Sequence, residues 1–357
     1  MTMTAPFTSG NGVGQAARMN VLAADAAGIP IALRNISGFG RRHVQTDLHR
    51  RFIHGRPYDT HLLHMNADQV SEFVRQKGTR SLLEHRSIGY WVWELPRFPK
   101  RWASVTRWFD EIWTPSHFSA AAIREQATCP VHVIPHAIWI EDSCMHRRQD
   151  FGIREDRYVF LFMFDCSSVI ARKNPFAVIE AFSSAFTSND SVELVLKFSN
   201  AESDPSFRTR LAQAVAGLPI VLLDSYLSLN ATHDLLRLCD AYVSLHRSEG
   251  FGLSLAEAMY CGKPVIATNY SGNADFMNHE NSIPIDYTLI ELTQDEGSYR
   301  KGNVWADPDI HQAADAMRRL YEDPLFSSKL GARAAHDIRL KHSPEAVGAL
   351  MHERLRQ

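Results

Sequence analysis

Cysteine is scarce in this chain, and long apolar runs are absent. The five cysteines are scattered and form no CxxC pair, which favours the reduced cytoplasm over a secreted fold built on disulfides. No apolar run approaches the roughly 20 residues of a membrane-spanning helix, and the N-terminal segment lacks a signal-peptide core. Repeats of solenoid period and low-complexity tracts are missing as well. These absences predict an ordinary cytoplasmic globular protein.

Charge of one sign does not dominate, because the net charge is only −2. Its distribution is uneven: residues 1–139 carry 16 Lys and Arg against 10 Asp and Glu, whereas the remainder carries 22 against 30. Chance variation of the surface explains this asymmetry as well as a partner does. If a partner is the cause, the first half contacts something anionic, such as a membrane surface or a phosphorylated acceptor. The near-neutral total disfavours nucleic acid.

The length of 357 residues predicts two domains of roughly 150–200 residues each. Strand-like apolar runs alternate with helical stretches along both halves. The runs of the second half are YVFLFMF, VELVLKF, PIVLLD, AYVSLH and PVIAT. Such alternation predicts an α/β fold with parallel sheets, divided into residues 1–139 and 140–342. Ser343 and Pro344 then begin a final helix over residues 343–357.

The most informative segment is SEGFGLSLAEAMYCGKPVIA, at residues 248–267. A glycine-spaced loop follows the strand-like run CDAYVSLH, and a short helix then begins near Leu253. The N-terminus of that helix would lie at the carboxyl edge of the sheet, where amides and the helix dipole favour a phosphate. Two carboxylates there suit hydroxyl-rich groups on either side of a diphosphate, so the segment predicts a nucleotide-sugar site. Its candidate residues are Glu249, Gly250, Phe251, Gly252, Leu253 and Glu257.

A second candidate site is the loop DCSSVIARKNP, at residues 165–175. Asn174 can cap a helix that Pro175 begins, and Arg172 and Lys173 stand directly before it. Two cations beside a helix N-terminus suit a diphosphate. A solvated basic turn is the alternative for the loop taken alone. The preceding buried strand places the loop at the same sheet edge as the first candidate site, which favours the diphosphate interpretation.

A third candidate is the glycine-spaced loop GNGVG, at residues 10–14, which precedes a helix. Gly12 and Gly14 would let the backbone approach a ligand closely, and the helix N-terminus again favours an anion. A plain turn is the alternative, because a lone GxG pattern is weak evidence. A nicotinamide site is disfavoured, since no acidic residue follows at the end of a clear second strand to bind a ribose.

Five of the seven tryptophans lie in one short stretch, interleaved with arginines and a lysine. Trp91, Trp93 and Trp113 fall in strand-like runs, so we expect them in the core. Trp102 and Trp108 fall in an expected helix beside the basic residues. Tryptophan combined with basic residues suits a surface that stacks on a sugar or lies at lipid headgroups. These two rings are therefore candidates for contact with the acceptor or a membrane.

No pattern in the sequence predicts an obligatory metal site. His61 and His64 are three residues apart, but the run HLLHMN reads as a strand. In a strand this spacing places the two rings on opposite faces. Packing or acceptor contact is therefore favoured over a shared metal.

The segment EGFGLSLAEAMYCGKPVIA resembles the donor-binding motif of glycosyltransferase family 4, the RfaG-like glycosyl transferases group 1. The resemblance covers most of residues 155–320 and is weaker in GNGVGQAAR, DEIWTPSHFSA and VHVIPH. It implies the GT-B fold: two Rossmann-like domains whose parallel sheets face across a cleft. Residues 1–139 would form the acceptor-side domain, with helix 343–357 packing back on it. Residues 140–342 would bind the nucleotide-sugar donor.

The resemblance also implies roles for the residues of the donor domain. Glu249 would contact hydroxyls of the transferred sugar, and Glu257 would bind the nucleotide ribose. The amides from Gly250 to Leu253 would meet the phosphates. Lys173 matches the family's phosphate-binding lysine, and Arg172 would take the part of an arginine that the family places several residues earlier. Glu249, Lys173 and Arg172 are thus the predicted catalytic residues.

In the first domain the resemblance implies that Gly12 and Gly14 also belong to the donor site. The family usually has a histidine on the acceptor side, where this chain has Trp93 and Glu94. These two residues and Trp102 are the predicted acceptor-side residues.

The activity implied by the resemblance is that of a retaining hexosyltransferase. It would move a hexose from a nucleotide-diphosphate sugar, its co-substrate, to a glycan or lipid-linked acceptor. The pathway would be synthesis of lipopolysaccharide, exopolysaccharide or another cell-surface polysaccharide. No cofactor and no obligatory metal are expected, and the protein would be cytoplasmic, with peripheral contact at the inner face of an anionic membrane. The alternatives are a GT-B sugar-nucleotide epimerase and a non-catalytic protein that binds nucleotide-sugars.

Overall fold

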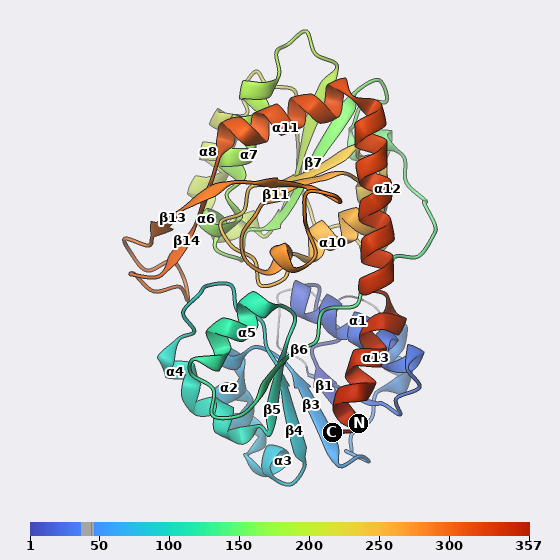
Figure 1. Cartoon of the computed structure of the whole chain (residues 1–357), viewed down its shortest axis with the longest axis vertical. Coiled ribbons are helices and arrows are strands. Elements are labelled where there is room, and N and C mark those ends of the chain that lie inside the picture. The colour runs from blue at the N-terminus through green and yellow to red at the C-terminus, as the bar shows by residue number, and fades with distance from the viewer. Residues whose placement is uncertain (37–43, 45) are drawn as a thin grey trace. The chain divides into compact units, whose positions relative to one another are not determined.

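The computed structural model describes residues 1–36, 44 and 46–357. The chain forms two units, one of residues 1–139 with 340–357 and the other of residues 140–339. Each unit contains one six-stranded parallel sheet with helices packed on it (Figure 1).

The first unit consists of short strands that alternate with helices. Its strands are β1 (Thr2–Ala5), β2 (Ala32–Asn35), β3 (Thr60–His64), β4 (Arg86–Tyr90), β5 (Glu111–Thr114) and β6 (Val131–Val133). Its α-helices are α1 (Gly12–Ala26), α2 (Ala67–Lys77), α3 (Arg80–Leu83), α4 (Lys100–Ala103), α5 (His117–Arg124) and α13 (Pro344–Leu355). The sheet has the order β2-β1-β3-β4-β5-β6 and is parallel in every described pair.

The last helix, α13, packs on α1 in the core of the first unit. Its N-cap is Ser343, whose side chain accepts a hydrogen bond from a backbone amide in the first turn. Val347 and Met351 are fully buried on the face toward α1. Gly348 lies so close to α1 that an added Cβ would overlap the carbonyl oxygen of Ala23. The close approach of these two helices therefore requires glycine at this position.

The second unit has longer strands and an added hairpin. Its strands are β7 (Tyr158–Asp165), β8 (Val192–Ser199), β9 (Ile220–Asp224), β10 (Ala241–Ser244), β11 (Val265–Thr268), β12 (Ile283–Ile285), β13 (Tyr287–Glu291) and β14 (Val304–Pro308). Its α-helices are α6 (Ile170–Lys173), α7 (Pro175–Ala185), α8 (Pro205–Ala214), α9 (Leu229–Leu238), α10 (Leu253–Tyr260), α11 (Ile310–Glu322) and α12 (Pro324–Lys341), the last of which ends in the first unit's residue range.

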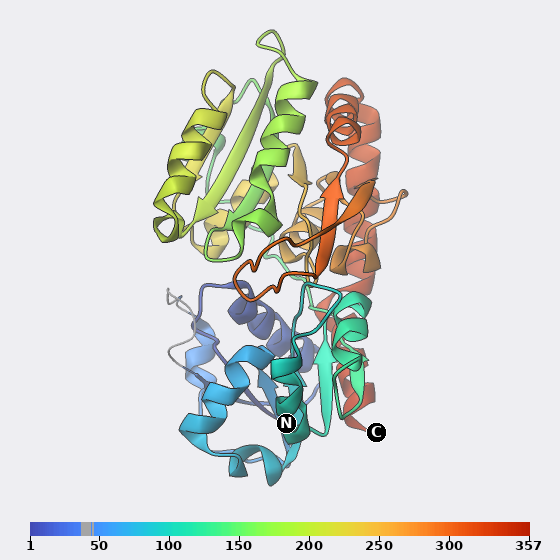
Figure 2. The ribbon, with the colours of Figure 1, turned by 90° about the vertical axis from the view of Figure 1, so that its left-hand side faces the viewer.

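The sheet of the second unit has the order β12-β11-β10-β7-β8-β9. Strand β7 is buried along almost its whole length, as its continuous apolar sequence YVFLFMF predicts for a central parallel strand. Helix α7 packs with α8 and α11, and α9 packs with α10, so helices cover both faces (Figure 1, Figure 2). Strands β13 and β14 form a separate antiparallel pair.

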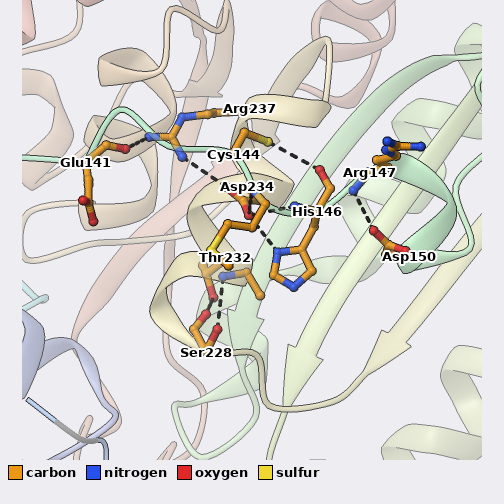
Figure 3. Close-up of polar contacts among 11 residues, drawn as sticks. Glu141, Cys144, His146, Arg147, Asp150, Ser228, Thr232, Asp234 and Arg237 are labelled. Carbon is orange, nitrogen blue, oxygen red and sulfur yellow. Dashed lines mark hydrogen bonds and ion pairs between the residues drawn. The ribbon is translucent and has the colours of Figure 1, made fainter.

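One buried carboxylate fastens the first residues of the second unit to α9 (Figure 3). Asp234 accepts hydrogen bonds from the backbone amides of Met145 and His146 and from the His146 ring, at 2.7–3.2 Å. Arg237 also contacts Asp234 and donates to the carbonyl oxygen of Glu141. The exposed segment over residues 141–147 is thereby fixed to its own unit.

The structure corrects two predictions about secondary structure and adds one element that was not predicted. The run RSIGYWVWEL is a strand only as far as Tyr90, so Trp91 and Trp93 lie in the loop beyond β4. Trp108 lies in a 3₁₀ turn, Ser104–Trp108, rather than in the helix of Trp102. The β13–β14 hairpin was not expected, because its first strand is exposed and lacks an apolar run.

None of the helices in the described part of the chain combines the length and the apolarity needed to cross a bilayer.

Candidate functional site

The sheet order of the second unit reverses between β7 and β10. From β7 the chain adds β8 and β9 on one side, and it then returns to place β10 on the other side of β7. Ligands of open parallel sheets bind at such a switch point, beside the carboxyl ends of the strands. The loops that follow β7 and β10 contain the first two candidate sites of the sequence. The topology thus brings both to one place.

Three charged side chains meet between these two loops. Lys173 forms an ion pair with Glu249, and the Nη1 atom of Arg172 lies 3.1 Å from the other oxygen of the same carboxylate. Arg172 also donates to the carbonyl oxygen of Ser248 at 2.6 Å. The three side chains are largely buried, with 18%, 15% and 5% of Lys173, Glu249 and Arg172 exposed. Two of the predicted catalytic residues, Arg172 and Lys173, are therefore both in contact with the third, Glu249.

The charges of this group decide the ionisation of Glu249. Burial alone would raise the pKa of Glu249, but the positive charges of Lys173 and Arg172 outweigh burial and hold the pKa well below its ordinary value of 4.5. Glu249 is therefore an anion at neutral pH. Because one carboxylate faces two cations, an anionic ligand could take its place on either cation.

Asn174 and Pro175 begin helix α7 directly after the two cations in the chain. Asn174 is the N-cap of α7, as predicted, but its backbone is left-handed (φ 56°) and its side chain does not cap the helix. The side-chain NH₂ group of Asn174 instead donates to the carbonyl oxygen of Leu245 at 2.9 Å, and Leu245 directly follows β10. Asn174 therefore ties the loop after β7 to the loop after β10.

The glycine-spaced loop lies between Glu249 and α10. Gly252 is the N-cap of α10 with φ +96°, a conformation that favours glycine. Phe251 is buried and its ring packs against Phe276. Leu253 begins the helix. The positive end of α10 thus lies directly after Glu249 in the chain.

Glu257 is half-buried on α10, two helical positions past the buried Leu255. It belongs to the short helix that begins directly after the glycine-spaced loop. Its predicted contact with a ribose stays a prediction.

A third loop of this site, the one after β11, was missed in the sequence. Ser271 accepts a hydrogen bond from the backbone amide of Glu249 at 2.7 Å, and the amide of Gly272 donates to the Glu249 carbonyl at 2.9 Å. A Cβ on Gly272 would overlap the carbonyl of Gly250. Ser271 has φ 75°, a strained conformation for a residue other than glycine, and such strain gathers at functional sites. The polar tripeptide SGN soon after the strand PVIAT was the available signal.

His246, which follows β10, and Asn273, which follows β11, form a buried polar pair. The Nε2 atom of His246 lies 3.0 Å from the Asn273 side-chain oxygen, and its Nδ1 lies 3.1 Å from the Ser244 hydroxyl. Burial lowers the pKa of His246, although the charge of Glu249 opposes this. The ring is therefore neutral near pH 7 and serves to hold the loop after β11.

In the first unit the glycine loop also lies at a switch point, between β1 and β3. Asn11 caps α1 by accepting from the amide of Gly14 at 3.0 Å. A Cβ on Gly14 would overlap the carbonyl of Ser9, whereas Gly12 is exposed in the first turn of α1. Arg18 donates to the Ser9 carbonyl at 2.9 Å and thus fastens the loop. Gly14 serves the close packing of this turn, and the predicted donor contact of both glycines stays a prediction.

The predicted acceptor-side residues lie together in the first unit. Trp93 is buried, as expected for the core, and its indole N–H donates to the Arg97 carbonyl at 3.1 Å. Trp102 is half-buried and meets the Trp93 ring edge to face at 5.2 Å. Glu94 is half-buried in the adjacent loop. Trp91 and Trp113 are fully buried, which confirms the core prediction for these rings.

His61 and His64 point to opposite sides of β3. His61 hydrogen-bonds the Thr4 hydroxyl at 2.8 Å, whereas His64 lies 3.3 Å from the side-chain nitrogen of Asn20 and stacks on Tyr90. Both rings are buried. The two rings thus contact different partners, and the prediction that they do not share a metal stays a prediction.

Cys144, His146 and Asp234 form another group of reactive residue types (Figure 3). Desolvation and the charge of Asp234 raise the pKa of the Cys144 thiol above its ordinary value. The thiolate, not the thiol, is the nucleophile, so this arrangement disfavours covalent chemistry at Cys144. Nowhere in residues 1–36, 44 and 46–357 are three or more His, Cys, Asp or Glu side chains grouped as a metal would require.

Comparison with known proteins identifies the family of the chain. The family "Glycosyl transferases group 1" matches residues 146–337, which is more than half of the chain. Trehalose synthase of Rubrobacter xylanophilus is 26% identical over 207 residues, which make up 56% of this chain and 43% of that protein. The chain therefore spans less than half the length of this curated relative.

Several solved structures share the fold. HepE of Anabaena, in complex with UDP and glucose, has a TM-score of 0.67 at 15% identity and aligns over 99% of this chain and 98% of its own. Sucrose-phosphate synthase of Thermosynechococcus elongatus has a TM-score of 0.68 at 15% identity, over 100% and 98% of the two chains. Such low identities concern the fold alone, and they confirm the predicted GT-B fold. Together with the family match, they show that the chain belongs to the glycosyl transferases group 1.

Proposed function

We propose that this protein is a retaining hexosyltransferase that uses a nucleotide-diphosphate sugar as its donor. The acceptor is a glycan or a lipid-linked glycan, and the product enters a cell-surface polysaccharide. HepE, which shares the fold, was crystallised with UDP-glucose, so uridine diphosphate sugars are the first donors to test.

The contact of Arg172, Lys173 and Glu249 at the switch point carries this proposal. The two cations offer a place for a diphosphate, and the N-terminus of α10 adds the positive end of a helix dipole. Once a diphosphate occupies the cations, the Glu249 carboxylate is released to accept hydrogen bonds from sugar hydroxyls. A nucleotide-diphosphate sugar is the ligand that satisfies both requirements.

The proposed chemistry leaves the configuration at the anomeric carbon unchanged. The bond from that carbon to the diphosphate oxygen breaks, and the acceptor oxygen forms its bond on the same face of the sugar. The acceptor proton passes to the departing diphosphate oxygen. The protein's part is to stabilise the charge that grows on the diphosphate, and fixed cations in a site of low exposure do this well.

A screen of donors tests the proposed function. We expect one of UDP-, GDP- or ADP-hexoses to raise the melting temperature, because a ligand that binds the folded state stabilises it by mass action. Incubation with that donor in labelled form and a glycan acceptor should give a glycoside with the donor's anomeric configuration. An epimerised donor would identify an epimerase instead. Binding without any product would identify a non-catalytic binding protein.

Removal of either partner of the central ion pair should severely impair turnover. We expect Lys173→Ala to lower kcat about 10²–10³-fold, the usual loss for one preorganised charge-stabilising group, and Glu249→Ala to abolish transfer. Steady-state kinetics with the donor from the screen measures both. Lys329→Ala, which removes an exposed lysine of the same unit, should leave kcat unchanged. A folded Lys173→Ala enzyme with near-normal turnover would remove Lys173 from the mechanism.

In the proposed function, Glu249 and the diphosphate compete for Arg172 and Lys173. Removing the charge of Glu249 should therefore strengthen binding of a nucleoside diphosphate, although it stops transfer. We expect Glu249→Gln to bind the free nucleoside diphosphate about tenfold more tightly than the wild type, corresponding to about 1.4 kcal/mol. Because the pKa of Glu249 is far below 5, this ratio should be constant from pH 5 to 8. Calorimetric titration at several pH values checks it. Glu193→Gln, in the buried part of β8, serves as control. Weaker binding by Glu249→Gln would contradict the competition.

We also propose that the protein acts in the cytoplasm at the inner face of a membrane. The guanidinium of Arg101 lies 4.6 Å from the centre of the Trp102 ring, and that of Arg107 lies 5.3 Å from the Trp108 ring. Both arginines are exposed, and both rings are half-buried. Such pairs suit anionic headgroups.

Vesicle sedimentation tests this membrane contact. At low salt we expect the protein to sediment with vesicles of phosphatidylglycerol but not of phosphatidylcholine, since the attraction is electrostatic. The variant Arg101→Ala/Arg107→Ala should lose about thirtyfold in affinity, since each charge contributes about 1 kcal/mol. Arg75→Ala, at an exposed arginine of the same unit, is the control. Equal binding to both kinds of vesicle, or to none, would refute a headgroup surface.

A further inference from the structure

Arg247, two residues before Glu249, connects the helix of the cations to the β13–β14 hairpin through its backbone. Its N–H donates to the carbonyl oxygen of Arg172 at 2.7 Å. Its own carbonyl oxygen accepts from the amide of Ala306, in β14, at 2.9 Å. The loop after β10 therefore runs between α6 and the hairpin and is bonded to both.

The side chain of Arg247 makes the same connection a second time. One guanidinium nitrogen donates to the carbonyl oxygen of Ala171 in α6 at 3.3 Å, and the other pairs with Asp307 of β14 at 3.0 Å. The guanidinium lies 5.5 Å from the centre of the Trp305 ring, which is buried. Only 23% of the Arg247 side chain is exposed. Its position is therefore fixed by three different groups.

Helix α6 needs such support because it consists of a single turn. One turn is not stable by itself, since nucleation fixes several residues for one hydrogen bond. Its last carbonyl groups also lack partners within the helix. Arg247 donates to two of them, at Ala171 and Arg172. The negative charge of Asp307 balances the positive charge of Arg247. The repulsion between Arg247 and the two cations on α6 is lower for this reason.

The hairpin touches the other end of α6 as well. Val169 is the N-cap of α6, and a Cβ on Gly297, in the loop between β13 and β14, would lie 3.0 Å from its side chain. Figure 1 shows the hairpin beside α6. Both ends of the turn that carries Arg172 and Lys173 are thus in contact with the hairpin or with the residue that is bonded to it.

We propose that Arg247 is a positioning residue, which sets the place of Arg172 and Lys173 by fixing α6 to the β13–β14 hairpin. The inference rests on the proposed function, because it assigns to these cations the donor's diphosphate. Misplacement of a charge-stabilising group by about 1 Å can cost about 10²-fold in rate. The hairpin, although it contributes none of the three catalytic residues, therefore determines how well they act.

A double-mutant cycle with Lys173 tests this role. We expect Arg247→Met, which keeps an apolar stem near Trp305, to lower kcat/KM for the donor about 10–100-fold. In a Lys173→Met background the same change should cost less than about threefold, because residues that act as a unit are not additive. Arg247→Lys should recover part of the loss. Independent losses that multiply in the double variant would overturn the proposal.

Arg318 offers a matched control in the same unit. It also pairs with an aspartate, Asp190, at 2.8 Å, and its guanidinium lies 4.6 Å from the Phe186 ring. These contacts lie past the far end of α7, which spans about 16 Å from Pro175. Arg318→Met should lower the melting temperature but leave kcat/KM within about twofold. An equal loss of kcat/KM in Arg247→Met and Arg318→Met would mean that Arg247 contributes to stability only, and it would overturn the proposal.

Hydrogen exchange separates this proposal from the proposed function. In Arg247→Met we expect the backbone amides over residues 169–174 to exchange at least about tenfold faster than in wild type, since local opening becomes easier. Arg318→Met should leave them unchanged. Asp307→Asn, at a half-exposed position, gives a milder version if Arg247→Met does not fold. Unchanged exchange overturns the positioning role, whereas a wild type that turns over no donor overturns only the proposed function.

Discussion

The carboxylate of Glu249, held between two cations in a place with little solvent, is the constraint on which the second unit's site depends. An ionised group loses its hydration on burial and is stable there only when it is paired and hydrogen-bonded. Lys173 and Arg172 supply the positive charges, and the Ser271 hydroxyl accepts a hydrogen bond from the backbone amide of Glu249. The two cations belong to the loop after β7 and the glutamate to the loop after β10. Their ion pairs therefore hold these two loops together.

Sheet topology explains why these loops meet. Strands β7 and β10 are neighbours although β8 and β9 lie between them in sequence, so the loops after their carboxyl ends place α6 and the glycine-spaced loop at one point. The loop after β11 joins them from the next strand. The first unit repeats the arrangement, since its glycine loop follows β1 at the reversal between β1 and β3. Each unit thus presents a helix N-terminus at its own switch point.

The sequence predicted the parts of this arrangement that local patterns encode. Apolar runs marked most strands, and glycine, proline and serine marked the ends of α10, α7 and α13. Glu249 and Lys173 were identified because each follows a recognisable strand. Ser271 and the partners of Arg247 were not, because their contacts join residues far apart in the chain. The β13–β14 hairpin was not predicted for a related reason. Strand β13 is held by pairing with β14 rather than by burial, so its sequence has no apolar pattern.

The balance of charge around α6 indicates what kind of ligand the site accommodates. Arg172, Lys173 and Arg247 contribute three positive charges, and Glu249 and Asp307 contribute two negative ones. Without a ligand each cation has a carboxylate nearby, so no buried charge is left uncompensated. A diphosphate that displaces Glu249 exchanges one anion for another, and the carboxylate it frees needs new hydrogen-bond donors. Hydroxyl groups attached to the diphosphate would supply these donors, whereas inorganic diphosphate cannot. The same electrostatics therefore favours a diphosphate that carries a sugar.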